Sequence, residues 1–297
     1  MSDPNSPTWV ILGGCPRSGT TLLNLLLNQH SQVQITNEHN IEYLVTTCRK
    51  LFYREKKVRN TIVRSKSARE NWTHEDILQA TLIDNGLTQK LLTELYRLNA
   101  IELGKPNAKV FGDKLPRYYK LDLNLIKSTL SNFVIIHVFR NPVDVVNSML
   151  RRASNTRDGT DYWKGANNVW SACEEWVKAW NFCIDNEMAS NKLDIVKIKY
   201  EDLVQEPEQV TRNICGRLSI STEIDIDRVN SADDNQRDQI RADEIDLVHQ
   251  LLGIDDLEWN SSLDSIMKQR GKIPHPQKPG MLTKISSLLS LKFFKQK

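Results

Sequence analysis

Residues 11–21 read ILGGCPRSGTT and connect a run of apolar residues to a run of leucines. The apolar residues 9–12 predict a buried strand, and residues 22–27 predict the helix that follows it. Backbone N–H groups in the connecting loop, at the positive end of that helix, can bind an anion without a charged side chain. The stretch therefore predicts an α/β fold with a phosphate-binding loop after its first strand.

This loop lacks the lysine of the nucleotide triphosphatases. Gly14 and Gly19 have the spacing of their P-loop, but Thr20 stands where that lysine is expected. The positive charge lies instead at Arg17, inside the loop. The loop thus indicates an anion site that differs from the site of a P-loop kinase.

The rest of the chain alternates between strand and helix patterns, which is typical of a parallel sheet covered by helices. Besides residues 9–13, strands are predicted at residues 33–36, 109–112, 133–139 and 194–199. We expect a P-loop-type parallel sheet of about five strands, with a helical insertion at residues 42–107 and a helical cap from residue 219 on. All of it belongs to one predicted domain, residues 1–297. Ligands of such sheets bind beyond the carboxyl ends of the strands.

Composition argues against several classes of protein. The net charge of +3 over 297 residues argues against a nucleic-acid-binding protein. Five cysteines without a C-x-x-C pair favour reduced thiols in the cytoplasm, and no Asp/His/Cys cluster has the spacing of metal ligands. We find no signal-peptide pattern and no apolar run long enough for a membrane span. The amphipathic tail at residues 281–297 leaves peripheral membrane contact open, beside docking on its own domain.

A second basic motif lies at residues 137–152, which read HVFRNPVDVVNSMLRR. Arg140 follows a predicted strand, and a helix is predicted after it. Ser148 and Arg152 are four residues apart on that helix, so a hydroxyl and a guanidinium share one face. Taken alone, the motif favours an ion pair between Arg140 and Asp144, with Ser148 merely packed. Together with the first loop, it predicts a second phosphate site.

These two motifs resemble those of the sulfotransferases that use 3′-phosphoadenosine 5′-phosphosulfate (PAPS). PRSGTT at residues 16–21 is similar to the family's 5′-phosphosulfate loop, and Arg140 with Ser148 is similar to its 3′-phosphate motif. The likeness extends more thinly over residues 9–207. It implies that the 5′-phosphosulfate is held by Arg17, Ser18, Gly19, Thr20 and Thr21, and the 3′-phosphate by Arg140, Ser148 and Arg152. The arginine in the loop most resembles the tyrosylprotein and glycan branches of the family.

A sulfuryl transfer needs a base for the acceptor's proton and cations for the negative charge that develops. Glu38 follows a predicted strand and lies twenty-one residues after Arg17, a distance that resembles that of the catalytic glutamate in the tyrosylprotein branch. His39 is the rival base, and a salt-bridged or helix-capping carboxylate is the alternative role for Glu38. In the segment GDKLP at residues 112–116, Lys114 stands where the cytosolic branch has a histidine. We expect Lys114 and Arg17 to stabilise charge rather than to accept a proton.

Aromatic residues add less specific expectations. Tyr200 follows the last predicted strand and resembles a family tyrosine near the nucleotide, although packing in the core explains it equally well. Trp170, Trp176 and Trp180 lie at helical spacing and predict the buried face of a long helix.

The acceptor is not encoded in these motifs. We expect a hydroxyl of a glycan, glycolipid or small metabolite, with peptide tyrosine behind it. The basic residues 49–70 can attract an anionic acceptor, or they form a solvated helix face. Two other functions stay open. A P-loop kinase or hydrolase would need the missing lysine and an Asp after an apolar strand, and a non-catalytic nucleotide-binding protein would need neither Glu38 nor Lys114.

Overall fold

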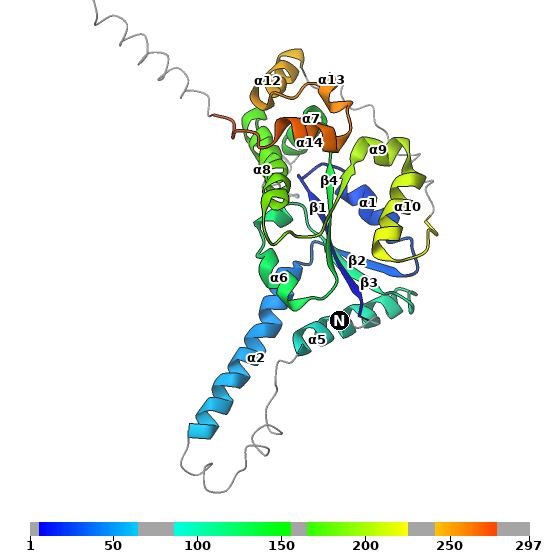
Figure 1. The fold of residues 1–297 in the computed structure, drawn as a ribbon, viewed down its shortest axis with the longest axis vertical. Coiled ribbons are helices and arrows are strands. Elements are labelled where there is room, and N and C mark those ends of the chain that lie inside the picture. The colour runs from blue at the N-terminus through cyan, green and yellow to red at the C-terminus, as the bar shows by residue number, and fades with distance from the viewer. Residues whose placement is uncertain (1–5, 65–85, 156–164, 225–240, 278–297) are drawn as a thin grey trace, which may run out of the picture.

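A computed structural model describes residues 6–64, 86–155, 165–224 and 241–277 of the chain. Its centre is a five-stranded parallel sheet in the order β2-β3-β1-β4-β5 (Figure 1). The strands are β1 (Thr8–Gly14), β2 (Val33–Asn37), β3 (Val110–Lys114), β4 (Phe133–Phe139) and β5 (Ile195–Lys199). This arrangement confirms the predicted fold class and places each strand within two residues of its predicted bounds.

The strand order places the first loop at the point where the chain changes direction in the sheet. β1 lies in the middle and pairs in parallel with β3 on one side and β4 on the other. The chain builds β2 and β3 on one side of β1 and then β4 and β5 on the other side. Open α/β sheets bind ligands in the crevice at such a reversal. The loop after β1 therefore occupies the position where a ligand is expected.

Helices surround the sheet, as the alternating pattern predicted. The structure describes α1 (Thr20–Leu27), α2 (Ile41–Arg64), α5 (Leu87–Glu102), α6 (Leu123–Thr129), α7 (Pro142–Asn155), α8 (Val169–Met188), α9 (Tyr200–Gln205), α10 (Pro207–Leu218), α12 (Ala242–Leu252), α13 (Asp256–Trp259), α14 (Leu263–Arg270) and the short 3₁₀ helix η1 (Tyr118–Lys120). In Figure 1, α1, α9 and α10 lie on one side of the sheet, and α6 and α8 lie on the other. The described parts of the predicted insertion and cap are helical.

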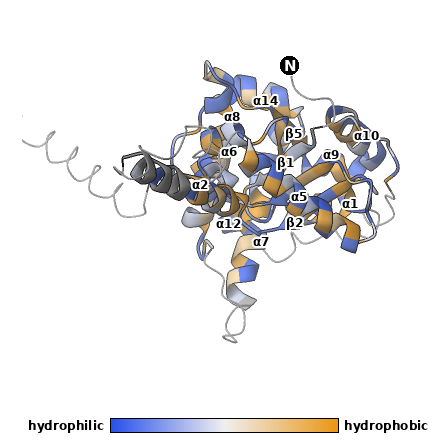
Figure 2. Cartoon of the chain, turned by 90° about the horizontal axis from the view of Figure 1, so that it is seen from below, coloured by the Kyte–Doolittle hydropathy of each residue, from blue (hydrophilic) through white to orange (hydrophobic). Residues whose placement is uncertain are grey.

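Apolar residues fill the space between the sheet and both helical layers. β1 and β4 are buried along nearly their whole length, because helices cover both faces of the sheet. Figure 2 shows hydrophobic residues gathered where α1 and α9 lie against the strands. On α8, the rings of Trp176 and Trp180 stack 5.2 Å apart and are 2% and 0% exposed. The prediction of a buried tryptophan face is therefore confirmed for these two residues, whereas Trp170 is only partly buried.

A buried polar group supports the strand that carries the first loop. The Tyr118 hydroxyl lies 2.7 Å from His137 Nδ1, and Cys183 Sγ lies 3.3 Å from the same nitrogen. Burial lowers the pKa of His137 to about 3, so this imidazole is neutral at physiological pH. The Tyr118 ring also packs on Gly13 of β1, where a Cβ would come within 2.3 Å of it. Gly13 therefore allows the close contact between β1 and the segment after β3.

Candidate active site

The loop between β1 and α1 has the geometry of an anion site. α1 begins at Thr20, its N-cap Gly19 offers no side-chain cap, and its first turn carries no acidic residue. The first amides of α1 therefore have a positive partial charge at the loop. Ser18 is 0% exposed, and its hydroxyl has no hydrogen-bond partner within the part of the chain that the structure describes. A buried hydroxyl of this kind fits a ligand oxygen.

Arg17 connects the two predicted phosphate motifs. Its backbone has a φ of +71°, in the left-handed region that non-glycine residues seldom adopt. Its Nε donates a hydrogen bond of 3.0 Å to Ser148 Oγ on α7. Burial lowers the pKa of Arg17, and the charges of Arg152, Arg140 and Arg151 lower it further. Four arginines from two distant segments thus gather at one place.

Tyr200 packs against Arg140, one of these four arginines. Arg140 follows β4, and its guanidinium carbon lies 4.3 Å from the centroid of the Tyr200 ring, a cation–π contact. The same ring packs on Gly19, where a Cβ would come within 2.2 Å of it. The Arg140 carbonyl accepts a hydrogen bond of 3.1 Å from Trp176 Nε1. Tyr200 therefore joins the phosphate loop to Arg140 and is itself 7% exposed.

Two helices that come later in the chain, α9 and α13, hold the segment after β4. The sequence did not predict these contacts. The amide of Asn141 donates to Glu201 Oε1 at 2.8 Å, and the Asn141 side chain donates to Asp256 Oδ1 at 2.8 Å. Burial raises the pKa of Glu201, although hydrogen bonds, including that from Asn141, oppose the rise. These contacts fix the residue next to Arg140 from two sides. Acidic residues at strand and helix ends are too common for their spacing alone to reveal this role.

Glu38 and Lys114 meet at the ends of β2 and β3. Lys114 Nζ lies 2.6 Å from Glu38 Oε1, and the Glu38 amide donates to the Lys114 carbonyl at 3.0 Å. The Lys114 side chain is 5% exposed and the Glu38 side chain is 56% exposed. The carboxylate is therefore accessible to a substrate while the ammonium behind it is buried. The structure brings together the two residues that the sequence named separately.

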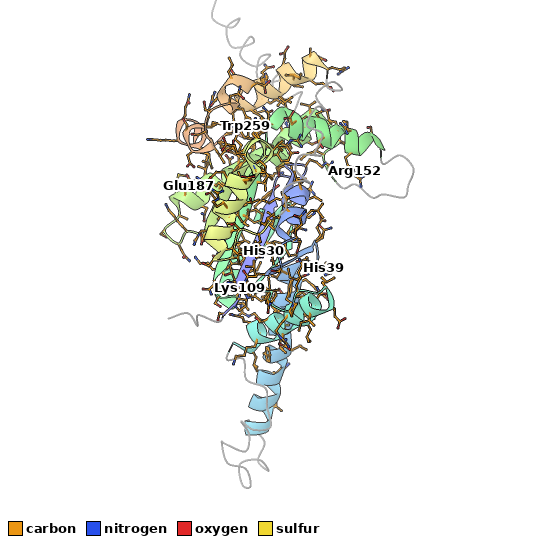
Figure 3. The ribbon with its side chains drawn as sticks, turned by 90° about the vertical axis from the view of Figure 1, so that its right-hand side faces the viewer. His30, His39, Lys109, Arg152, Glu187 and Trp259 are labelled. Carbon is orange, nitrogen blue, oxygen red and sulfur yellow. The ribbon has the colours of Figure 1, made fainter. Side chains whose placement is uncertain are left out.

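His39, the rival base, is adjacent but differently placed. Its side chain is exposed, and only its backbone N–H has a described hydrogen bond, to Asp113 Oδ1 at 3.1 Å. Figure 3 shows His39 and Arg152 along the same side of the molecule in that view. The close approach to Lys114 is made by Glu38 and not by His39.

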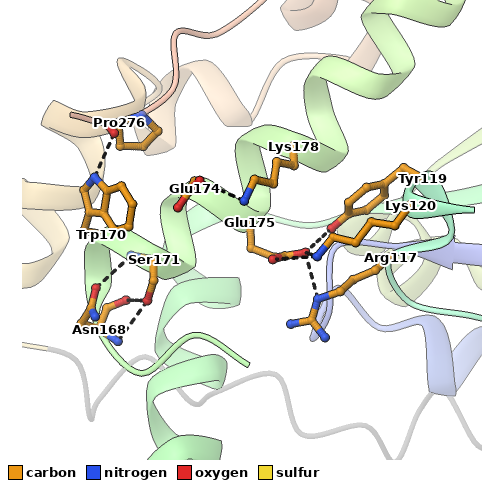
Figure 4. Close-up of polar contacts among 10 residues, drawn as sticks. All are labelled: Arg117, Tyr119, Lys120, Asn168, Trp170, Ser171, Glu174, Glu175, Lys178 and Pro276. Atoms are coloured by element: carbon orange, nitrogen blue, oxygen red, sulfur yellow. Dashed lines mark hydrogen bonds and ion pairs between the residues drawn. The ribbon is translucent and has the colours of Figure 1, made fainter. Parts of the chain in front are cut away.

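A polar cavity of about 330 Å³ lies between η1 and the first turns of α8. On its wall, Glu175 accepts hydrogen bonds from Arg117 Nε at 2.8 Å and from the Tyr119 hydroxyl at 2.6 Å (Figure 4). Lys120 Nζ lies 3.1 Å from the same carboxylate. Burial raises the pKa of Glu175, but the Tyr119 hydrogen bond and the Arg117 and Lys120 charges outweigh it, so that the pKa is lowered. The Arg117 amide donates to the Gly14 carbonyl at 3.1 Å. Arg117, on the wall of the cavity, therefore contacts the start of the phosphate loop.

Within the described ranges, no group of three or more His, Cys, Asp or Glu side chains is arranged to hold a metal ion. None of the helices in those ranges is long and apolar enough to cross a membrane. The tail at residues 281–297 lies outside the described residues, and so does part of the basic stretch at residues 49–70. Their predicted roles stay predictions.

Comparison with known proteins agrees with this geometry. Residues 7–223 match the sulfotransferase family. Protein-tyrosine sulfotransferase A from Caenorhabditis elegans is 24% identical over 272 residues, which cover 90% of this chain and 62% of that protein. The chain thus spans less than two thirds of the length of this curated relative.

Two solved structures to which this chain is similar are also sulfotransferases. The sulfotransferase domain from the curacin biosynthetic pathway is 19% identical, with a TM-score of 0.47, and the match covers 97% of this chain and 99% of that domain. The sulfotransferase from Alicyclobacillus acidocaldarius is 15% identical, with a TM-score of 0.48, and the match covers 88% of this chain and 100% of that protein.

Proposed function

This chain belongs to the sulfotransferase family, and we propose that it moves a sulfuryl group from PAPS to a hydroxyl acceptor. The observation that carries the proposal is the contact between Arg17 of the first loop and Ser148 of α7, with Arg140 and Arg152 beside it. Two anion sites in contact suit a nucleotide that carries a phosphosulfate at one end and a 3′-phosphate at the other. Charge-assisted hydrogen bonds from arginine are among the strongest that such a ligand can receive.

The donor is assigned to the residues that the two motifs supply. The 5′-phosphosulfate is assigned to the backbone and side chains of Arg17, Ser18, Gly19, Thr20 and Thr21. The 3′-phosphate is assigned to Arg140, Ser148 and Arg152, and Tyr200 borders both groups. The buried, unpartnered Ser18 hydroxyl and the uncapped start of α1 support this assignment.

The transfer itself requires one proton to move and one S–O bond to be exchanged. The acceptor oxygen attacks sulfur in line with the bond to the departing phosphate, and its proton passes to the Glu38 carboxylate. A new S–O bond forms as the old one breaks, and adenosine 3′,5′-bisphosphate (PAP) leaves with the bonding electrons. Arg17 and Lys114 stabilise the negative charge on the sulfuryl oxygens and on the leaving phosphate. The 2.6 Å contact with Lys114 holds the Glu38 side chain in place before the acceptor binds.

The proposed acceptor is polar. The cavity attached to the phosphate loop is lined by charged and amide side chains, including Arg117, Lys120, Asn167 and Glu174. Such a lining suits a glycan, the headgroup of a glycolipid or a small polar metabolite better than an apolar phenol. The name of the curated relative makes peptide tyrosine the second candidate.

The five free cysteines support a cytoplasmic location.

A P-loop kinase is the competing enzyme class, and it is disfavoured by residues that are present. Thr20 stands in place of the phosphate-binding lysine, and β4 ends before Arg140 rather than before an Asp. We expect transfer without a divalent cation, because arginines, Lys114 and loop amides can cover the sulfuryl charge.

The test uses ³⁵S-labelled PAPS with fractions of the native cell and with a panel of sugars and phenols, each with and without a chelator. Labelled product that forms at the same rate in the chelator supports sulfuryl transfer. Strict dependence on Mg²⁺ would favour a kinase. Tight binding of PAP without transfer to any acceptor would favour a non-catalytic nucleotide-binding protein.

A further inference from the structure

We propose that Asp113 is a positioning residue for the base, fixing the loop on which Glu38 stands; this inference rests on the proposed function. Asp113 belongs to β3, is 0% exposed and precedes Lys114. Asp113 lies in the segment GDKLP, but there the sequence indicated a role only for Lys114. Its role follows from what its two carboxylate oxygens bind.

Asp113 binds the loop on both sides of Glu38. Its Oδ1 accepts hydrogen bonds from Thr36 Oγ1 at 2.9 Å and from the His39 amide at 3.1 Å. Its Oδ2 accepts from the Ile41 amide at 3.2 Å. One carboxylate thus connects the end of β2, the residue after Glu38 and the first residue of α2.

The loop needs this support because its backbone conformation is unusual. Glu38 has a φ of +62° and Asn40 a φ of +60°, both in the left-handed region that costs energy for residues other than glycine. The Ile41 amide also lies in the first turn of α2, where backbone donors have no partner within the helix. Asp113 supplies an acceptor from a neighbouring strand. The carboxylate therefore stabilises a conformation that the local sequence does not favour.

Asp113 and Lys114 act on Glu38 in complementary ways. In the sheet register, Thr36 is opposite Asp113 and Asn37 is opposite Lys114. The carboxylate of Asp113 holds the backbone around Glu38, and the ammonium of Lys114 holds its side chain at 2.6 Å. Two consecutive residues of one buried strand thus position both the backbone and the carboxylate of Glu38.

The environment of Asp113 agrees with such a role. Burial raises the pKa of its carboxyl group, and the hydrogen bonds from Thr36 and from the amides of His39, Ile41 and Asn40 oppose that rise. A carboxylate without water around it is retained only where its oxygens are satisfied by donors. Here all the donors named belong to the segment that carries or adjoins Glu38.

The experiment compares Asp113→Ala and Asp113→Asn with Asp122→Ala. Asp122 is a matched control because its carboxylate also caps a helix, accepting from the Leu125 amide at 2.9 Å, but at α6. Three quantities are measured for each protein: the affinity for PAP, the kcat and KM of ³⁵S transfer from labelled PAPS to one acceptor fraction, and amide hydrogen exchange at residues 38–41. PAP binding reports on folding and on the donor site.

For Asp113→Ala we expect kcat to fall about tenfold or more, since the loss of several buried hydrogen bonds frees the loop. Affinity for PAP should stay within about twofold, and exchange at His39 and Ile41 should accelerate. Asp113→Asn keeps one acceptor oxygen in the same volume and should lie between the parent and Asp113→Ala. Asp122→Ala should leave kcat and the exchange at residues 38–41 unchanged.

Three results would overturn the proposal. The first is parental kcat in both Asp113 variants. The second is a loss of PAP affinity as large as the loss of kcat in Asp113→Asn, which would indicate general damage to the sheet. The third is unchanged exchange at residues 38–41. Failure of the proposed function is recognised separately, because the parent protein would then transfer no label from PAPS, while hydrogen exchange at residues 38–41 still reports whether Asp113 holds the loop.

Discussion

Beyond β1 and β4 the site gathers like charges, whereas beyond β2 and β3 it pairs opposite ones. In the first region, Arg17 lies among Arg140, Arg151 and Arg152, and its pKa is lowered first by burial and then by their charges. In the second, Lys114 and Glu38 form an ion pair of 2.6 Å. Such a concentration of positive charge suits the anionic ligand that we propose for it. The second keeps its charge balanced and leaves a carboxylate exposed.

The difference indicates a division of work between binding and chemistry. Clustered cations repel one another in the free protein, and an anionic ligand reverses that cost. A carboxylate paired with a buried ammonium is held in one geometry, which is what a general base requires. Substitutions in the first region should therefore change donor affinity, and substitutions in the second should change the rate.

Glu38→Gln gives the largest expected effect. Glutamine keeps the size and the hydrogen-bonding reach of the side chain but cannot accept the acceptor's proton. We expect kcat of sulfate transfer to fall by ~10²–10⁴, while affinity for PAP, which depends on the arginine region, stays nearly normal. Steady-state kinetics and calorimetry on the same preparation measure both. Should Glu38→Gln transfer at the parental rate while His39→Ala is inactive, the base is His39.

These two regions also differ in how far the sequence predicted them. The first loop and the Arg140 motif are local patterns, and each was placed correctly at the end of a strand. Their contact through Arg17 and Ser148 was not predicted, since it depends on β4 lying next to β1. Sequence spacing gives the parts of a site, whereas strand order decides which parts touch.

Two carboxylates that hold the backbone of the site, one on a strand and one on a helix, were not predicted. Asp113 stands beside Lys114 in the segment GDKLP and Glu201 follows Tyr200, but the contacts that each carboxylate makes, with Ile41 and with Asn141, lie far away in the sequence. Tyr200 was left between nucleotide packing and core packing, and the structure shows it packed on Gly19 and Arg140. Its contact with nucleotide stays a prediction.

Arg140→Ala should produce the next largest effect, on binding. If Arg140 contacts the 3′-phosphate, the parent should bind PAP more tightly than 5′-adenylate, which lacks that group. A charge-assisted hydrogen bond contributes about 1.5–3 kcal/mol, so the variant should lose roughly 10- to 100-fold of this preference. Calorimetric titration with both nucleotides measures it. Arg97→Ala, on α5 and paired with Glu94, is the matched control and should keep the full preference.

The absence of this preference would contradict the assignment of the 3′-phosphate site. Equal affinities of the parent protein for PAP and 5′-adenylate would remove the second phosphate site. The contrast between the two regions would then rest on the first loop alone.

Acid sensitivity tests the core beneath both regions. Because burial lowers the pKa of His137 to about 3 from an ordinary 6.5, the unfolded chain binds a proton that the folded protein excludes. The neutral His137 therefore makes its full contribution to the free energy of unfolding above pH 6.5. That contribution is lost as pH falls toward 3, and the loss is about 2 kcal/mol at pH 5. Denaturant titrations at pH 7 and pH 5 measure the loss. His137→Asn should lose less between these pH values than the parent, and a loss equal to the parent's would assign the sensitivity to other groups. His275→Gln, at an exposed position, should behave like the parent.

The smallest effect, on the stability of the free protein, distinguishes the two regions most directly. Arg17→Gln removes a charge that three neighbouring arginines repel, at the cost of one exposed hydrogen bond to Ser148. We expect the free protein to be unchanged or more stable by a few tenths of a kcal/mol, about the size of one surface charge interaction. Lys114→Gln removes one partner of an ion pair and should lower stability by about 0.5–1 kcal/mol.

With PAP added, the order of the two variants in stability reverses, because Arg17→Gln should lose much of the PAP-induced rise in Tm and Lys114→Gln should keep most of it. Thermal unfolding with and without PAP measures all four values. Equal losses of Tm in the two free variants would mean that the arginine cluster is already balanced within the protein, and the contrast between the two regions would fail.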